Sequence, residues 1–147
     1  MQWLFLVIAM LGGAALATQA GVNASLGRGL GHPITASFAS FLVGGLSLMI
    51  YGLVTQVPWL TVGRASQVPG WAWSGGLLGA GYVVASIMLA PKLGASSWVV
   101  AVVAGQVLAS VALDHFGLAG FPVQPFNLIR AAGLLLVVAG VLIVRHF

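Results

Sequence analysis

The chain has 147 residues, of which 61% are apolar and only five bases and one acid carry a fixed charge. Soluble domains carry about 25% charged residues, and roughly 30% of the surface of a chain this long stays in contact with solvent. A water-soluble fold is therefore excluded, and lipid surrounds most of the chain. The bases are scattered singly and form no patch, which excludes a nucleic-acid-binding protein, and the absence of cysteine excludes disulfides.

Five apolar runs are long enough to cross a bilayer core of about 30 Å, which takes about 20 helical residues. They cover residues 3–23, 33–57, 71–90, 95–113 and 126–144. We expect a single all-α membrane domain over residues 1–147, with five transmembrane helices joined by short loops. The first run lacks the basic start and the short apolar stretch of a signal peptide, so we interpret it as an uncleaved span.

Cations are almost evenly divided between the two sides of the predicted bundle. Arg28, Lys92 and Arg145 fall on one side, and Arg64 and Arg130 on the other. A clear Lys/Arg excess normally fixes orientation, so this near balance predicts insertion both ways. Opposite insertions would pair as an antiparallel homodimer of ten helices, an inverted-repeat arrangement. A single orientation, set by weak bias or by a partner chain such as a paralogue, is the alternative.

Small residues recur at four-residue spacing, which lets membrane helices approach closely. Gly75 and Gly79 share a face of the third span, and Gly105 and Ala109 share a face of the fourth. We expect these four residues to pack helices or subunits together. The alternative is that glycine and alanine are simply common in membrane helices.

Proline, glycine and tryptophan mark the expected ends of the spans. Pro33 suits a helix start, Pro91 is expected to end the third span, and the glycine-rich residues 27–31 are interpreted as a flexible turn. Tryptophans near span ends are typical of the membrane interface, and Trp98 lies about one turn inside the fourth span. The tryptophans nearest to span ends are Trp3, Trp59, Trp71 and Trp73.

Amide side chains inside the spans are candidates for a binding cavity, because buried polar groups are costly in hydrocarbon unless they find partners. Gln19 and Asn23 share a face of the first span, and Gln106 begins a polar row on the fourth. Hydrogen bonds between helices are the structural alternative for the amides. Hydroxyl groups commonly bond the preceding backbone carbonyl instead. The further predicted ligand contacts are Tyr82, Trp98 and Ser110.

Asp114 is the only carboxylate side chain of the chain and lies at the end of the same polar row. His115 follows it, and Arg130 lies about one turn inside the fifth span. Asp114 and Arg130 either form a salt bridge that ties down the fourth loop or act, with His115, in coupling or gating. In the second case Asp114 would exchange a proton, and Asp114→Asn would abolish pH-driven transport.

Enzyme signatures are missing from the sequence. One acid cannot form a carboxylate pair, and the isolated histidines have no metal-ligand spacing. We therefore expect no catalytic residues, no metal and no cofactor.

Four segments carry a family resemblance: residues 19–26 (QAGVNASL), 105–107 (GQV), 114–120 (DHFGLAG) and 130–133 (RAAG). They resemble the YdcZ-like inner-membrane exporters of bacteria, within the drug/metabolite transporter superfamily. The resemblance implies a multi-pass protein of the bacterial inner membrane and kinship to ten-helix carriers made of two five-helix halves. The more distant small multidrug resistance proteins place a glutamate three residues before a glycine of their first helix. Thr18 stands at that place before Gly21 here, so proton–cation exchange by that route is not implied.

These observations predict a secondary transporter that exports small organic molecules by alternating access between the halves of a dimer. A site without a deep carboxylate favours neutral, zwitterionic or amphipathic cargo over cations. A non-transporting module that pairs with another membrane protein, or a passive pore, are the alternatives.

Overall fold

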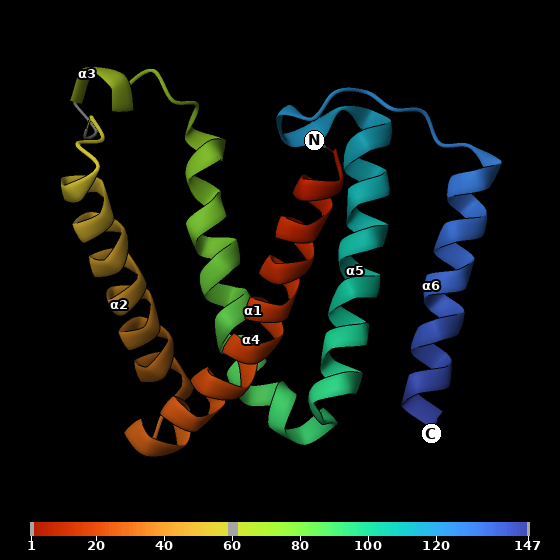
Figure 1. The fold of residues 1–147 in the computed structure, drawn as a ribbon, viewed down its shortest axis with the longest axis horizontal. Helices are drawn as coiled ribbons and strands as arrows, with labels where there is room; N and C mark the ends of the chain where they lie inside the picture. Colours follow the sequence, from red (N-terminus) through yellow and green to blue (C-terminus); the bar gives the residue numbers. More distant parts are fainter. Residues whose placement is uncertain (1, 59–61, 147) are drawn as a thin grey trace. The chain divides into compact units, whose positions relative to one another are not determined.

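The computed structural model describes residues 2–58 and 62–146. Its regular elements are all helical within these residues (Figure 1). In chain order they are α1 (Gln2–Leu30), α2 (Pro33–Val54), α3 (Val62–Ala65), η1 (Gly70–Trp73), α4 (Ser74–Leu93), α5 (Ala95–Phe116), η2 (Leu118–Gly120) and α6 (Leu128–His146).

Span-length helices account for most of the described chain, which confirms the all-α prediction for these residues. Four are long and apolar enough to cross a membrane: Gln2–Leu30, Pro33–Val54, Gly70–Leu93 and Ala95–Phe116. The fifth predicted span corresponds to a shorter apolar helix, Leu128–Val144, inside α6. Trp59 lies outside the described residues.

Two predicted helix ends are wrong. The expected turn at residues 27–31 is helical up to Leu30, and the helix ends where Gly31 adopts φ 75°. Pro91 lies inside α4, which continues to Leu93 and ends before Gly94, at φ 83°. A proline removes one backbone donor, which membrane helices tolerate, whereas a positive φ turns the chain out of the helix.

The chain divides into an N-terminal unit, residues 1–92, and a C-terminal unit, residues 93–147. In the N-terminal unit, α1 and α2 form a helical hairpin that turns at Gly31 and His32, and the two helices diverge away from the turn (Figure 1). The His32 side chain caps α2 by accepting a hydrogen bond from the Ile34 amide. Apolar packing joins this hairpin to α4 through a small core of Ala36, Val83 and Ile87, with Leu26 and Tyr82 against it.

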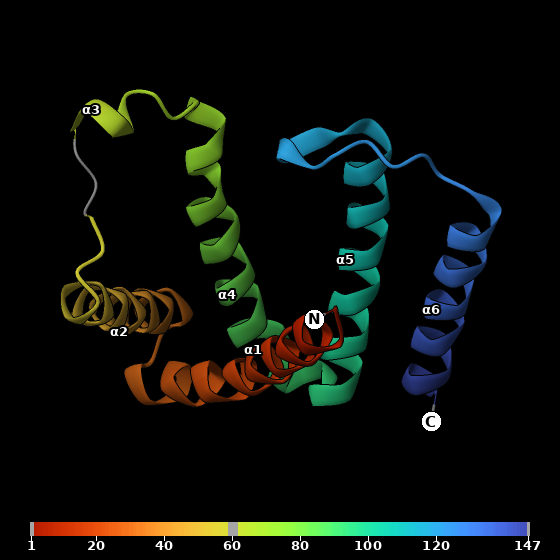
Figure 2. The ribbon, with the colours of Figure 1, turned by 45° about the horizontal axis from the view of Figure 1, so that its top comes forward.

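The C-terminal unit is a second antiparallel hairpin, in which α5 and α6 lie side by side in both views (Figures 1 and 2). Ala131, Leu134, Val137 and Val141 are the partly buried apolar side chains of α6. Their spacing of three or four residues defines one helix face, and α5 is the helix that α6 contacts. This hairpin is therefore closed by a narrow apolar seam.

Little of the apolar surface is buried. The buried hydrophobic residues among those described are Ala20, Ala24, Ala36, Val83, Ile87, Ala90 and Trp98. Large side chains along the rest of the spans are exposed, as at Trp3, which is 82% exposed. Apolar patches this extensive mark a membrane or protein interface, which agrees with helices that face lipid.

Candidate functional site: a groove in the N-terminal unit

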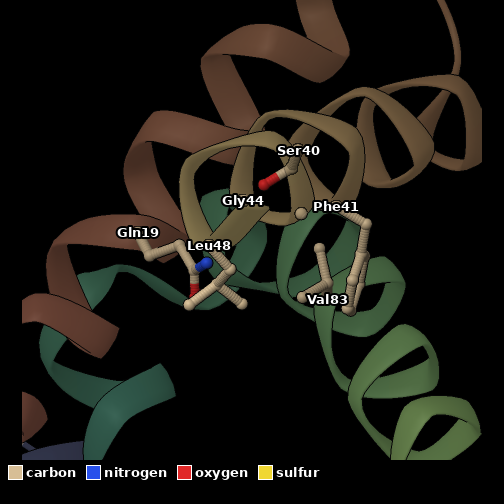
Figure 3. A pocket seen from close by; sticks show the side chains of 7 residues that line it. Gln19, Ser40, Phe41, Gly44, Leu48 and Val83 are labelled. Atoms are coloured by element: carbon tan, nitrogen blue, oxygen red, sulfur yellow. The ribbon is translucent and has the colours of Figure 1, made fainter. Parts of the chain in front are cut away.

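A groove of about 330 Å³ lies among three helices of the N-terminal unit. Gln19 borders it from α1 and Val83 from α4, and the remaining lining comes from α2 (Figure 3). Two adjacent glycines, Gly44 and Gly45, leave room on α2 because they have no side chain. The α2 side chains that line the groove are Ser40, Phe41 and Leu48.

The lining is apolar except for two polar side chains. The Gln19 amide supplies both donors and an acceptor, and the Ser40 hydroxyl supplies one of each. Both groups are uncharged, and the groove has no acidic or basic lining residue. A small apolar cavity with a few polar groups is the usual form of a site for a small organic molecule. The predicted ligand residue Gln19 thus lies at such a cavity.

Asn23 lies one helical turn beyond Gln19 on α1, and only 3% of it is exposed. Its Nδ2 has no hydrogen-bond partner among the described residues. An unmet buried donor costs about 1–3 kcal/mol, so it is unusual for a side chain of purely structural role. Asn23 does not itself line the groove.

The other predicted contacts are divided between the two units. Tyr82 packs against the core of the N-terminal unit. Gln106 and Ser110 are exposed on α5, and Trp98 is buried. Ser110 Oγ donates to the Val107 carbonyl at 2.9 Å, the local bond that was the structural alternative for the hydroxyl.

Asp114 and Arg130 form a salt bridge, one of the two alternatives for this pair, with 3.3 Å between Asp114 Oδ2 and Arg130 Nη1. Each side chain is 29% exposed. The guanidinium also donates to the carbonyl and side-chain oxygens of Gln124. The backbone N–H of Gln124 donates to the backbone carbonyl of Asp114 at 2.7 Å. His115 Nδ1 accepts a hydrogen bond from the backbone N–H of Phe126 at 3.2 Å. The three predicted coupling residues therefore hold the α5–α6 connection in place.

The predicted packing glycines have different surroundings. A Cβ on Gly79 would meet the Phe41 ring at 3.5 Å, whereas a Cβ on Gly75 or Gly105 would meet no packed atom within 4 Å. Ala109 is exposed. The closest glycine contact of the N-terminal unit was missed: a Cβ on Gly27 would lie 2.7 Å from Ile87 Cγ2. The glycine-rich sequence there was the available signal, but it was interpreted as a turn.

Ser40, Phe41 and Gly44 were not predicted as site residues. Ser40 and Gly44 are four apart, which places them on one helix face, but this pattern does not identify the helix that faces them. Among the described residues, no group of three or more His, Cys, Asp or Glu side chains could hold a metal ion.

Comparison with known proteins identifies a family. A family model described as "Putative inner membrane exporter, YdcZ" matches residues 4–143. No curated protein and no solved structure matches the chain. The matched region includes the groove, Asn23 and the Asp114–Arg130 pair, and the four span-length apolar helices fit a multi-pass membrane protein. The chain belongs to the YdcZ family of inner membrane proteins.

Proposed function

We propose that the chain is a subunit of a secondary exporter and that the groove at Gln19 is part of its substrate site. The observation that carries the proposal is an uncharged groove of about 330 Å³ bordered by Gln19 and Ser40, with Asn23, whose Nδ2 has no partner among the described residues, one turn away. The family description, an inner membrane exporter, supports the direction of transport.

The cargo follows from the charges around the groove. An apolar wall with one amide and one hydroxyl suits a small molecule with a few polar groups. A cation would lack a carboxylate there, because the one acid of the chain, Asp114, is paired with Arg130 in the C-terminal unit. Neutral, zwitterionic or amphipathic molecules are therefore the preferred class, with Gln106, Ser110, Tyr82 and Trp98 as further proposed contacts.

A second copy of the chain completes the site in this proposal. Gln19, Gly44 and Leu48 are exposed, so the groove is open on one side. The small-residue face at Gly105 and Ala109 is also exposed, which leaves room for close approach of another helix. The near balance of cations supports opposite insertion of the two copies, and rocking of such an inverted pair gives alternating access.

Reporter fusions at both termini test the orientation in cells. Alkaline phosphatase reports a terminus on the periplasmic side, and green fluorescent protein reports one on the cytoplasmic side. Signals from both sides at each terminus are expected for dual insertion. A strictly one-sided signal at each terminus would refute the antiparallel dimer.

Proteoliposomes test the transport function. Vesicles with the full-length protein are loaded with a defined mixture of small neutral, zwitterionic and cationic organic molecules, and release is followed by mass spectrometry. Saturable release with counterflow of neutral or zwitterionic members is expected. Gln19→Leu should lower the rate about tenfold, the value of one hydrogen bond of about 1.4 kcal/mol.

Gln67→Leu is the matched control, since Gln67 is exposed between α3 and η1. It should leave the rate unchanged. Release that does not saturate would indicate a passive pore instead. No release, together with a co-purified membrane protein, would indicate a partner module.

A further inference from the structure

A second cavity, of about 250 Å³, lies in the N-terminal unit where α1 and α4 end and α2 begins. Arg28 and Lys92 border it with their positive charges. Pro33 lines it from the start of α2, and Ile87 and Met88 give it an apolar side. Two of the five bases of the chain thus border one cavity, although the sequence places them in different connections.

Close packing of α1 on α4 brings these two cations to the same cavity. Gly27 lies so close to Ile87 that a Cβ there would be 2.7 Å from Cγ2. Arg28 directly follows Gly27, and Lys92 lies about one and a half helical turns beyond Ile87. Arg28 is partly oriented by a hydrogen bond of 2.8 Å from its Nη2 to Ser25 Oγ.

The two charges have no acid of the chain to balance them. The only carboxylate side chain, Asp114, belongs to the C-terminal unit and is paired with Arg130 at 3.3 Å. Arg28 and Lys92 each lie in the last turn of a helix, where a cation is favourable. The helix dipole explains why each cation is favourable at its own helix end. It does not explain why the two cations border one cavity that also has an apolar side.

We propose that this cavity binds an anionic phospholipid, with the phosphate between Arg28 and Lys92 and the start of an acyl chain against Ile87 and Met88. Arginine and lysine are the usual phosphate-binding side chains, and basic pockets between membrane helices bind anionic headgroups. The apolar side favours a lipid over free phosphate, which has no apolar part. The site is separate from the groove at Gln19 and does not depend on the proposed function.

Native mass spectrometry of the delipidated full-length protein tests the site. The protein in detergent is titrated with phosphatidylglycerol, with phosphatidylcholine and with inorganic phosphate in separate arms. Preferential binding of phosphatidylglycerol is expected. Arg28→Gln and Lys92→Gln should each lower its affinity about fivefold, and the double substitution about 25-fold.

Arg64→Gln is the control, because it removes a base of α3 that does not line the cavity. It should leave the affinity unchanged. Equal binding of the two lipids, or an equal loss in Arg64→Gln, would overturn the site. Phosphate binding with the same dependence on Arg28 and Lys92, and without a lipid preference, would overturn the lipid as its ligand.

Met88→Trp keeps the test decisive if the double substitution does not fold. This change retains both cations and fills the apolar side of the cavity. It should lower phosphatidylglycerol affinity at least about fivefold, because extra bulk in a packed site costs about 1 kcal/mol or more, while binding of inorganic phosphate stays as it is. Unchanged lipid affinity in Met88→Trp would overturn the proposal.

Discussion

Gly27 of α1 lies directly against Ile87 of α4, so that a Cβ on Gly27 would be only 2.7 Å from Ile87 Cγ2. The bare backbone of α1 at this point is what allows the two helices to meet. Ile87 also packs with Ala36 and Val83 in the core of the N-terminal unit. Val83 lines the groove at Gln19, whereas Gly27 and Ile87 line the second cavity. One packing contact therefore supports both candidate sites.

Gly27→Ala should lower the free energy of unfolding by about 1–3 kcal/mol, the usual cost of an extra methyl group in a packed contact. Ile87 cannot easily move away, because a β-branched side chain has one preferred rotamer in a helix. Unfolding of the detergent-solubilised protein in SDS, followed by tryptophan fluorescence, measures the change.

Gly29→Ala is the matched control for Gly27→Ala. Gly29 lies in the same helix and has no neighbouring atom within 4 Å. Alanine is the better helix former by about 1 kcal/mol, so this change should stabilise the protein. If both substitutions stabilised it equally, α1 and α4 would not pack through Gly27.

Asn23→Leu should raise the free energy of unfolding by about 1 kcal/mol, because it replaces a buried donor that has no partner with an apolar group of similar size. The same variant should transport the substrate more slowly, since the amide is proposed to serve a ligand. Stability is measured by unfolding in SDS and transport by release from proteoliposomes.

Asn127→Leu provides the contrast for Asn23→Leu. Asn127 Oδ1 accepts a hydrogen bond from the Arg130 amide at 2.9 Å and so caps α6. Its loss should destabilise the protein by about 1 kcal/mol. If Asn23→Leu were destabilising to the same degree, the Asn23 amide would have a structural partner.

Asp114→Asn and Arg130→Gln should each destabilise the protein by about 1 kcal/mol or less, as expected for a partly exposed ion pair. Their effects should add only in part, because both changes break the same ion pair and Arg130→Gln also removes the bonds to Gln124. A double-mutant cycle on the free energy of unfolding measures this coupling. The coupling-group hypothesis makes a different prediction: Asp114→Asn abolishes pH-driven release, while Arg130→Gln, at equal stability, does not.

Gly94→Ala should cost about 1–3 kcal/mol of stability. Gly94 has φ 83° and ψ 154°, a conformation essentially limited to glycine. Gly133→Ala, in the regular part of α6 with no neighbour within 4 Å, is the control and should be neutral or stabilising. The two midpoints of thermal unfolding, read by circular dichroism, decide the comparison, and equal midpoints would contradict the strained turn.

Several features of the fold were predictable because they depend on local sequence. The spans were located by the length of the apolar runs, since crossing a bilayer requires a fixed number of helical residues. The Asp114–Arg130 pair was predictable because the chain offers that acid one nearby base across a short connection. The helix ends at residues 27–31 and at Pro91 were not predictable, because glycine and proline do not end every helix in which they occur, and packing decides whether they do.

The candidate site was predictable only in part. Gln19 was identified because a polar side chain in a membrane span is costly unless it binds a partner or a ligand. Its neighbours Ser40 and Phe41 could not be, because they lie on another helix whose rotation about its own axis is set by packing. The same holds for Arg28 and Lys92, which the sequence presents only as separate loop charges.

The sequence by itself determined that this chain consists of apolar helices long enough to cross a membrane, because the cost of exposing apolar side chains to water depends on composition and run length. Only the tertiary structure decided which residues come together: Gly27 packs against Ile87, Gln19 and Ser40 line one groove, and Arg28 and Lys92 line one cavity. The physical reason is that contacts between helices depend on how each helix is rotated and where two helices cross. Steric fit between side chains distant in the sequence fixes both quantities.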